Sequence, residues 1–261
     1  MKKLTIGILG GRGMLGSDLV KFLGEHHQTT AIDKDNYSEF QGQEFDVLVN
    51  ANGNSRRFWA NQNILEDFEA STTSVYKSLF DFKFGKYIYI SSSDVYPNHS
   101  HLDHTREDIF IDPKILSPYG LHKYLSEIIV SNHTQDFLIL RCSMMLGQNL
   151  KKGPVHDILQ NQPLFVTEDS RLQMITTKGV AEVIEELLRR PVKKEVFNVG
   201  GRGTVDFQSI SQYFGKNISF AKEAKCQIYE MPTLKLASLI PPYPLKTSDE
   251  YLREFLSTHL G

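Results

Sequence analysis

The chain has 261 residues, of which 40% are hydrophobic and 23% are charged, the composition of an ordinary globular protein. Its formal net charge of -2 provides no strong field toward nucleic acid or an acidic membrane, and no apolar run is long enough to cross a bilayer. The two cysteines are too few for a disulfide framework or a zinc site, and the first apolar run does not have the pattern of a secretory signal. We therefore expect a cytoplasmic protein that has neither nucleic acid nor a membrane as its partner.

The first predicted elements are a buried strand at residues 4–9 and a helix at residues 14–23, separated by a glycine-rich turn. Glycines spaced three apart at such a turn let the backbone bend tightly and approach a diphosphate, and the helix N-terminus offers N–H groups to the anion. An ordinary strand–helix turn is the alternative. The order of the elements favours a dinucleotide-binding loop made by Gly10, Gly11, Arg12, Gly13, Met14, Leu15 and Gly16.

The next strand, at residues 29–32, ends in Asp33, which stands 23 residues after Gly10. An acidic side chain at this position accepts hydrogen bonds from the adenine ribose of NAD and repels the 2′-phosphate of NADP. Arg12 and Lys34 favour the opposite choice, because a cation near this ribose binds the NADP phosphate. The pattern predicts NAD as the cofactor and leaves NADP open as the alternative.

Strands and helices continue to alternate along the chain. Strands are predicted at residues 46–50, 87–90, 137–140 and 195–199, and helices at residues 63–82, 119–130 and 180–188. This alternation predicts an α/β protein with a doubly wound parallel sheet of the Rossmann type. Only 12 residues separate Asp33 from Asp46, too few for a full helix and a further strand, so we expect an abbreviated crossover there.

The chain is predicted to divide into a dinucleotide-binding domain and a small C-terminal substrate lobe. Residues 1–148 and 178–200 carry the alternation and form the first unit, whereas residues 149–177 and 201–261 lack it and form the second. Ligands of such sheets bind at the carboxyl ends of the strands. We therefore expect one crevice to be lined by the glycine turn, by the serines at 91–93, and by Ala51, Asn52 and Gly53.

Three side chains predict hydride-transfer chemistry in that crevice. Tyr119 and Lys123 stand four residues apart, hence on one face of a helix, where the ammonium group is expected to lower the tyrosine pKa and to reach a cofactor ribose. Ser92 ends the preceding strand, where its hydroxyl can hold a substrate oxygen as charge develops. A chance Tyr–Lys pair is the alternative, but the serine and the dinucleotide loop favour a catalytic set.

The motifs of the chain together resemble those of one family. They are Gly10-x-x-Gly13-x-x-Gly16, Asp33, Ser91-Ser92-Ser93-Asp94-Val95-Tyr96, Ser117-Pro118-Tyr119-x-x-x-Lys123 and Arg171. This set, spread over residues 4–215, resembles the extended short-chain dehydrogenase/reductase family, the NAD-dependent epimerase/dehydratase group that acts on nucleotide sugars. The resemblance implies that the tyrosine of the set transfers a proton while a hydride moves between the cofactor and a sugar carbon.

The resemblance also implies roles for further residues. Asp94 stands two residues after the serine, where it is expected to act as a short general base, with a turn cap as the alternative. Arg171 matches the arginine that the family uses on the substrate diphosphate. Ser93 and Ser143 are expected to contact the substrate.

Local similarity at residues 12–17 and 95–97 to 4-keto-sugar reductases of the GDP-fucose synthase type narrows the expected reaction. It predicts an NAD(P)-dependent reductase or epimerase that acts on a nucleotide-linked sugar. A nucleotide-sugar dehydratase and a non-catalytic NAD(P)-binding sensor or scaffold are the alternatives. We expect no metal, because neither cysteines nor carboxylates complete a site with His99, His101 and His104.

The helices predicted at residues 63–82 and 119–130 carry more apolar residues than one buried face needs. These residues are Leu65, Phe68, Val75, Tyr76, Leu79, Phe80, Leu121, Leu125, Ile128 and Ile129. Members of the resembled family pair the two helices into a two-fold interface, which implies a homodimer. The alternative is that other parts of the same chain cover the surplus.

Overall fold

A six-stranded parallel sheet forms the centre of the computed structural model, which describes residues 2–54, 56–215, 217–241 and 245–259. Its strands are β1 (Thr5–Leu9), β2 (Gln28–Ile32), β3 (Glu44–Asn50), β4 (Lys83–Ser92), β5 (Phe137–Cys142) and β10 (Glu195–Val199). They lie in the order β10-β5-β4-β3-β1-β2, and every neighbouring pair is parallel. The predicted doubly wound parallel sheet is confirmed.

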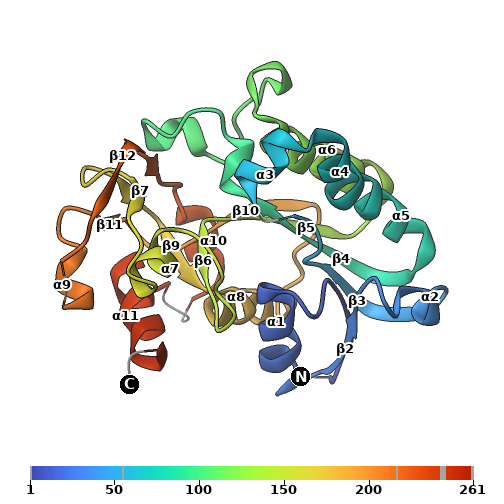
Figure 1. The fold of residues 1–261 in the computed structure, drawn as a ribbon. Helices are drawn as coiled ribbons and strands as arrows, with labels where there is room; N and C mark the ends of the chain where they lie inside the picture. The colour runs from blue at the N-terminus through green and yellow to red at the C-terminus, as the bar shows by residue number, and fades with distance from the viewer. Residues whose placement is uncertain (1, 55, 216, 242–244, 260–261) are drawn as a thin grey trace.

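Helices cover both faces of this sheet (Figure 1). Both faces are apolar, as a sheet buried on two sides requires. The helices α1 (Met14–Gly24) and α8 (Thr177–Leu188) lie on one face, where Leu19 and Val183 pack against strand residues such as Ile6. The helices α5 (Ser74–Asp81) and α6 (Pro118–His133) lie on the other face, where Val75 and Val130 pack with a second set of strand residues. Alternate side chains of each strand therefore enter two different cores.

The crossover between β2 and β3 is as short as the sequence indicates. It contains only the four-residue helix α2 (Tyr37–Phe40), and β3 returns directly to the other side of β1. A common doubly wound sheet has a further strand outside the second one. In the described part of this chain β2 is the edge strand, because the short crossover leaves no residues for that further strand.

The region predicted as one helix at residues 63–82 is helical throughout but not uniform. It consists of α4 (Ile64–Phe68), the π-helical turn η1 (Glu69–Thr73) and α5. Ser71 and Thr72 of this turn are buried. Such turns are frequent near functional sites. A short helix that the sequence patterns did not indicate, α3 (Arg57–Gln62), precedes this region.

Smaller sheets lie beside the central one toward the C-terminus (Figure 1). They pair β6 (Met144–Leu146) with β9 (Met174–Thr176), β7 (Leu164–Val166) with β12 (Phe220–Lys225), and β8 (Arg171–Leu172) with β11 (Val205–Asp206) and β13 (Ile228–Tyr229). Their apolar side chains form a second core together with α7 (Pro154–Leu159) and α11 (Ser248–His259). The remaining elements are η2 (Ser93–Val95), η3 (Leu102–Thr105), η4 (Pro113–Ile115), α9 (Ser211–Phe214) and α10 (Leu234–Leu239).

The C-terminal residues do not pack with the small sheets alone. Leu236 and Tyr251, from α10 and α11, lie in the same core as β1 and α1. The division into two units at residues 149–177 and 201–261 therefore stays a prediction. Among the described residues, no helix is both long and apolar enough to span a membrane.

Candidate functional site

At three glycines, the turn between β1 and α1 and the start of α1 have room for backbone only. Gly10 has a φ of +73°, and a Cβ atom on it would lie 2.9 Å from the Cα of Asn52. A Cβ on Gly11 would lie 2.7 Å from the Cα of Ala31, and one on Gly16 would lie 2.0 Å from the carbonyl oxygen of Gly10. The glycines at these positions thus allow β1, β2 and the loop after β3 to meet at one point.

The N-terminus of α1 is open to an anion. The helix begins at Met14, and Gly13, which precedes it, has no side chain with which to cap the first N–H groups. These N–H groups and the helix dipole favour a negatively charged ligand. The loop therefore has the shape and the charge that the diphosphate of a dinucleotide requires.

Asp33 lies directly after β2, beside this loop. Its carboxylate accepts hydrogen bonds from the backbone N–H groups of Arg12, at 3.2 Å, and Lys34, at 2.9 Å. The guanidinium group of Arg12 instead pairs with Asp35 at 3.3 Å. Asp35, which the sequence reasoning did not weigh, is therefore a second acidic group on this side of the loop.

The loop after β3 brings the glycine turn close to α6. The backbone of Asn52 lies against Gly10, and its N–H donates to the side chain of Asn50 at 3.0 Å. Gly53 follows with a φ of +118°, and a Cβ on it would lie 3.4 Å from the Nζ of Lys123. Ala51, Asn52 and Gly53 thus lie between the glycine turn and Lys123.

Tyr119 and Lys123 lie in the first two turns of α6. Pro118 starts the helix, and the hydroxyl of Ser117 caps it by accepting from the N–H of Gly120 at 3.2 Å. Both functional side chains are buried, with 7% of Tyr119 and 6% of Lys123 exposed. The ammonium of Lys123 donates to the carbonyl oxygen of Ile90 at 3.2 Å.

The expected effect of Lys123 on the tyrosine is wrong for this structure. Burial raises the pKa of Tyr119, and the negative charge of Asp94 raises it further, while the nearby Ser92 acts in the opposite direction. Burial also lowers the pKa of Lys123 to about 8. The phenol therefore stays protonated at neutral pH, because its loss of solvation outweighs any help from the cation.

Ser92 and Asp94 are joined to two residues that the sequence patterns did not single out. The Ser92 hydroxyl donates to Oδ2 of Asp94 at 3.1 Å. Oδ1 of Asp94 pairs with Arg57 of α3 at 2.9 Å and accepts from the hydroxyl of Tyr229 of β13 at 3.3 Å. Both carboxylate oxygens are thus engaged. No local pattern indicates Arg57 or Tyr229, because they meet Asp94 only through the fold.

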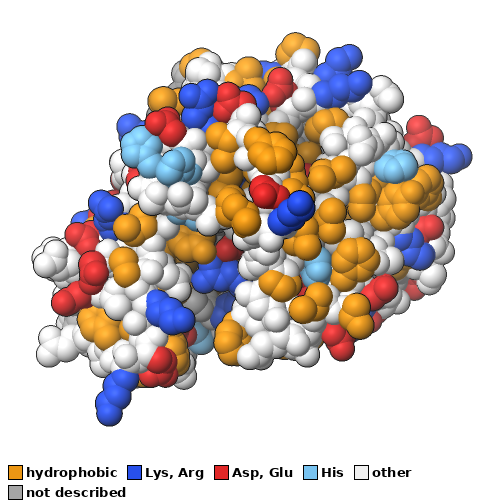
Figure 2. All heavy atoms as spheres, turned by 90° about the horizontal axis from the view of Figure 1, so that it is seen from above, with side chains coloured by type: hydrophobic (Ala, Val, Ile, Leu, Met, Phe, Trp, Pro, Cys, Tyr) orange, Lys and Arg blue, Asp and Glu red, His pale blue; other side chains and the backbone are white. Residues whose placement is uncertain are grey.

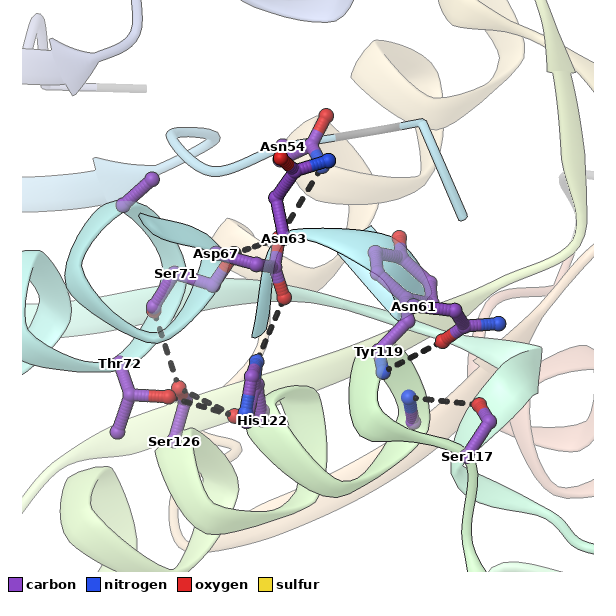
Figure 3. A network of polar contacts seen from close by, with 12 residues as sticks. Asn54, Asn61, Asn63, Asp67, Ser71, Thr72, Ser117, Tyr119, His122 and Ser126 are labelled. Atoms are coloured by element: carbon purple, nitrogen blue, oxygen red, sulfur yellow. Dashed lines mark hydrogen bonds and ion pairs between the residues drawn. The ribbon is translucent and has the colours of Figure 1, made fainter. Parts of the chain in front are cut away.

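A buried polar network holds α6 to the loop after β3 (Figure 3). Asp67 of α4, which is 0% exposed, accepts from His122 at 2.6 Å, from Asn54 at 3.1 Å and from Ser71 at 3.3 Å. Because His122 immediately precedes Lys123, this network fixes the helix that carries Lys123. The position of His122 inside the Tyr119–Lys123 motif was the only sequence signal for it.

The remaining predicted residues lie at the border between the central and the small sheets. Arg171 is exposed in β8, beside the strand that carries Tyr229. Ser143 follows β5 and is buried, and its hydroxyl has no hydrogen-bond partner among the described residues. Ser93 is buried, and its carbonyl oxygen lies 3.1 Å from Nε2 of His99. Within the described ranges, no group of three or more histidine, cysteine or acidic side chains is placed to hold a metal ion.

The sheet, the glycine-rich turn and the helix that follows it define a Rossmann-type nucleotide-binding protein. More particularly, the chain belongs to the NAD dependent epimerase/dehydratase family, whose model matches residues 6–200. It is therefore an NAD(P)-dependent enzyme of the extended short-chain dehydrogenase/reductase type, and the resemblance drawn from its motifs is confirmed. A search of curated protein sequences finds no match.

Solved structures with similar folds act on nucleotide sugars. The UDP-glucuronic acid 4-epimerase of Bacillus cereus superposes with a TM-score of 0.78 at 17% identity, over 98% of this chain and 99% of that one. The dTDP-4-dehydrorhamnose reductase of Bacillus anthracis, solved with NADP, gives 0.81 at 16% identity, over 99% of each chain. A UDP-galactose 4-epimerase gives 0.79 at 19% identity, over 98% and 100%. At sequence identities of 16–19%, these structural similarities establish the fold alone.

Proposed function

We propose that this chain reduces or epimerises a nucleotide-linked sugar by hydride transfer, most specifically as a 4-keto-sugar reductase or epimerase. The observation that carries the proposal is the position of Ser92 at the end of β4, where its side chain interacts with that of Tyr119, while Lys123 lies against the loop at Gly53. A protein that only senses or carries a dinucleotide has no need of a buried phenol there. The structures named above are called epimerases and reductases of nucleotide sugars, which supports the same class of substrate.

The proposed chemistry follows from the surroundings of each group. A bound NAD(P) supplies or accepts the hydride. Tyr119 gives a proton to the sugar oxygen or takes one from it, and its raised pKa suits the donor role of a reduction. Ser92 holds the same oxygen by a hydrogen bond. Lys123, which lies against the loop at Gly53, binds the cofactor ribose.

The cofactor is proposed to be NAD rather than NADP. Asp33 stands at the end of β2 and repels a 2′-phosphate, while Arg12 is engaged by Asp35. The proposed contacts with the dinucleotide are made by Gly10, Gly11, Arg12, Gly13, Met14, Leu15, Gly16, Asp33, Lys34, Ala51, Asn52 and Gly53. NADP stays the alternative, since one of the similar structures holds it.

The substrate is proposed to lie between the central sheet and the small sheets. Arg171 of β8 would bind the diphosphate, and Ser93 and Ser143 would contact the sugar; the unpartnered hydroxyl of Ser143 supports the last assignment. In this proposal residues 1–148 and 178–200 hold the cofactor, while residues 149–177 and 201–261 hold the substrate. A dehydratase needs a free base beside the sugar, and the engaged oxygens of Asp94 favour a reductase or epimerase over it.

Turnover of 4-keto nucleotide sugars with NADH or NADPH tests the proposal. Purified protein is expected to oxidise the reduced cofactor, and Tyr119→Phe is expected to lose most of this activity while binding the cofactor normally. Tyr76→Phe, at an exposed tyrosine of α5, is the matched control and should keep full activity. Full turnover by Tyr119→Phe would contradict the mechanism.

We also propose that two chains form a homodimer through α4, α5 and α6. Large hydrophobic side chains stay exposed on these helices, and Figure 2 shows hydrophobic side chains gathered on that side of the molecule. They are Leu65, Phe68, Tyr76, Phe80 and Ile128. Val75 and Leu79, by contrast, pack into the core, so only part of the apolar surplus is left for a partner.

A further inference from the structure

An ion pair that the proposed chemistry does not use lies beside the candidate catalytic serine. Nη1 of Arg57 is 2.9 Å from Oδ1 of Asp94, and it also donates to the hydroxyl of Tyr229. Nη2 of Arg57 donates to Oε1 of Gln227 at 3.3 Å. The guanidinium group thus reaches from α3, which packs against α4 and α6, to β13 of the small sheets. The centroid of the Tyr229 ring lies 5.3 Å from the guanidinium carbon of Arg57.

Arg57 is close to the proposed reacting centre. Asp94 uses one oxygen for Arg57 and the other for the hydroxyl of Ser92, at 3.1 Å. A single carboxylate therefore separates the guanidinium group from the serine that holds the sugar oxygen. This places Arg57 near substituents of the sugar ring, whereas the side chain of Arg171 is exposed on β8.

The contact with Asp94 leaves much of the guanidinium group available. A carboxylate that fully engages an arginine accepts two parallel hydrogen bonds from it. Asp94 accepts from Nη1 alone, because its second oxygen is turned to Ser92. In the described structure Nη2 has only the long contact with Gln227. Arg57 therefore keeps donor N–H groups with which to bind a second carboxylate.

The surroundings of Arg57 carry an excess of positive charge. Although much of the Lys152 side chain is exposed, burial of its ammonium group and repulsion by Arg56 and Arg57 lower the pKa of Lys152 to about 8, with Asp94 acting in the opposite direction. Burial and the charge of Asp94 raise the pKa of Tyr229 to about 12. Burial lowers the pKa of His99, which stacks near Tyr229. Arg57 and Lys152 thus share one carboxylate, with Arg56 close to Lys152, while the phenol and the imidazole are neutral at pH 7.

We propose that Arg57 binds an acidic group carried by the sugar of the substrate. This inference rests on the proposed function and deepens it: the substrate class is a nucleotide sugar with a carboxylate beside the reacting carbon. Asp94 and Tyr229 hold the guanidinium group in place, and the substrate carboxylate takes the donors that they leave free. Lys152 adds attraction, and its partial burial limits how far solvent and salt screen it. Asp94 is then a positioning residue for Arg57 and Ser92.

Binding of matched nucleotide sugars tests this assignment. The probes are UDP-, dTDP- and GDP-linked pairs that differ only in a C6 carboxylate or a C6 hydroxymethyl group, together with the free nucleoside diphosphates. Affinities are measured by calorimetry on the full chain with NAD. We expect the wild type to prefer the carboxylate member of the pair that it binds, and Arg57→Met to raise the Kd of that member about tenfold or more. The Kd values of the hydroxymethyl sugar and the diphosphate should change little.

A second variant is expected to act in the opposite direction. Asp94→Asn keeps the size of the side chain but removes the charge that competes for Arg57. It should lower the Kd of the carboxylate sugar roughly threefold, since a neighbouring like charge is removed. Arg106→Met, which breaks a similar arginine–aspartate pair on an exposed loop, is the matched control and should leave every Kd unchanged.

Four results would overturn the inference. Equal loss of affinity for both sugars and for the free diphosphate in Arg57→Met would mean that Arg57 binds the diphosphate instead. Unchanged affinities in Arg57→Met, or a wild type without preference for the carboxylate sugar, would mean that Arg57 does not select the sugar. If turnover that depends on Tyr119 persists in either case, the proposed function is kept and only the role of Arg57 is lost. A wild type that binds NAD but none of the nucleotide sugars would overturn both.

Discussion

Asp33 carries the proposed cofactor preference through one carboxylate. Its two oxygens accept backbone N–H groups of the adjoining loop, which hold its charge where an adenine ribose would lie. Asp33→Ala should therefore raise the affinity for NADPH relative to NADH about tenfold, which corresponds to roughly 1.4 kcal/mol of repulsion removed. Fluorescence titration with both reduced cofactors measures the ratio. Asp35→Ala, which frees Arg12 from its ion pair, is the comparison.

A wild type that prefers NADPH, with the same ratio in Asp33→Ala, would show that Arg12 and Lys34 set the preference. In that case Asp35→Ala should strengthen NADPH binding, because the released guanidinium group can reach a phosphate.

The pKa of Lys123 indicates how the activity should depend on pH. Burial lowers its pKa to about 8, so the side chain is an ammonium below this pH and a neutral amine above it. If the ammonium holds the cofactor ribose, kcat/KM should fall as the pH rises through about 8, because this ratio reports the free enzyme. Lys152 has a pKa of about 8 as well, so Lys152→Met provides the control. The fall should persist in Lys152→Met, and its disappearance there would assign it to Lys152.

At the scale of elements, Asp67 joins the loop after β3, the helix α4 and the helix α6. Asp67→Ala would leave His122 buried without its partner, and an unsatisfied buried hydrogen-bond donor costs about 1–3 kcal/mol. Denaturant unfolding should show a decrease of this size in the free energy of unfolding. Asp108→Ala, which breaks an exposed pair with Arg106, should leave the unfolding midpoint unchanged. A similar, small effect of both variants would mean that the network in Figure 3 is not a structural link.

Element boundaries were predictable wherever apolar side chains follow one period. The strand at 195–199 matches β10 (Glu195–Val199), and the helix expected at 14–23 matches α1 (Met14–Gly24). The π-helical turn η1 and the helix α3 were not predictable. Both depend on polar side chains whose partners are distant, such as the contact of Ser126 with the carbonyl oxygen of Ser71.

For the whole molecule, the exposed apolar face on α4, α5 and α6 predicts association. Leu65 is 78% exposed and Phe80 is 68% exposed, and burying both against a second copy is favourable. Light scattering at micromolar concentration should give a mass about twice 29.8 kDa, and a variant with Leu65→Glu and Phe80→Glu should give the monomer mass. Phe110→Glu is the control, because Phe110 is 86% exposed but lies outside this face. A wild-type mass that stays at 29.8 kDa at every concentration would exclude the dimer.

The parallel sheet, the glycine turn and the family could be recognised from the sequence, because each shows itself in motifs whose own residues are close along the chain. A strand, a glycine spacing or a Tyr–Lys spacing of four can be recognised without knowing what lies opposite. The short crossover was visible for the same reason, since 12 residues cannot hold a helix and a strand.

The protonation state of Tyr119 and the contacts of Asp94 could be known only from the tertiary structure. Arg57 and Tyr229 are 172 residues apart, and nothing local to either indicates that they share Asp94. The expected fall in the Tyr119 pKa became a rise because burial, which depends on every element packed around the phenol, outweighs the neighbouring cation. Spacing along a chain can bring two side chains to one face of a helix, but solvation and long-range pairing are properties of the folded whole.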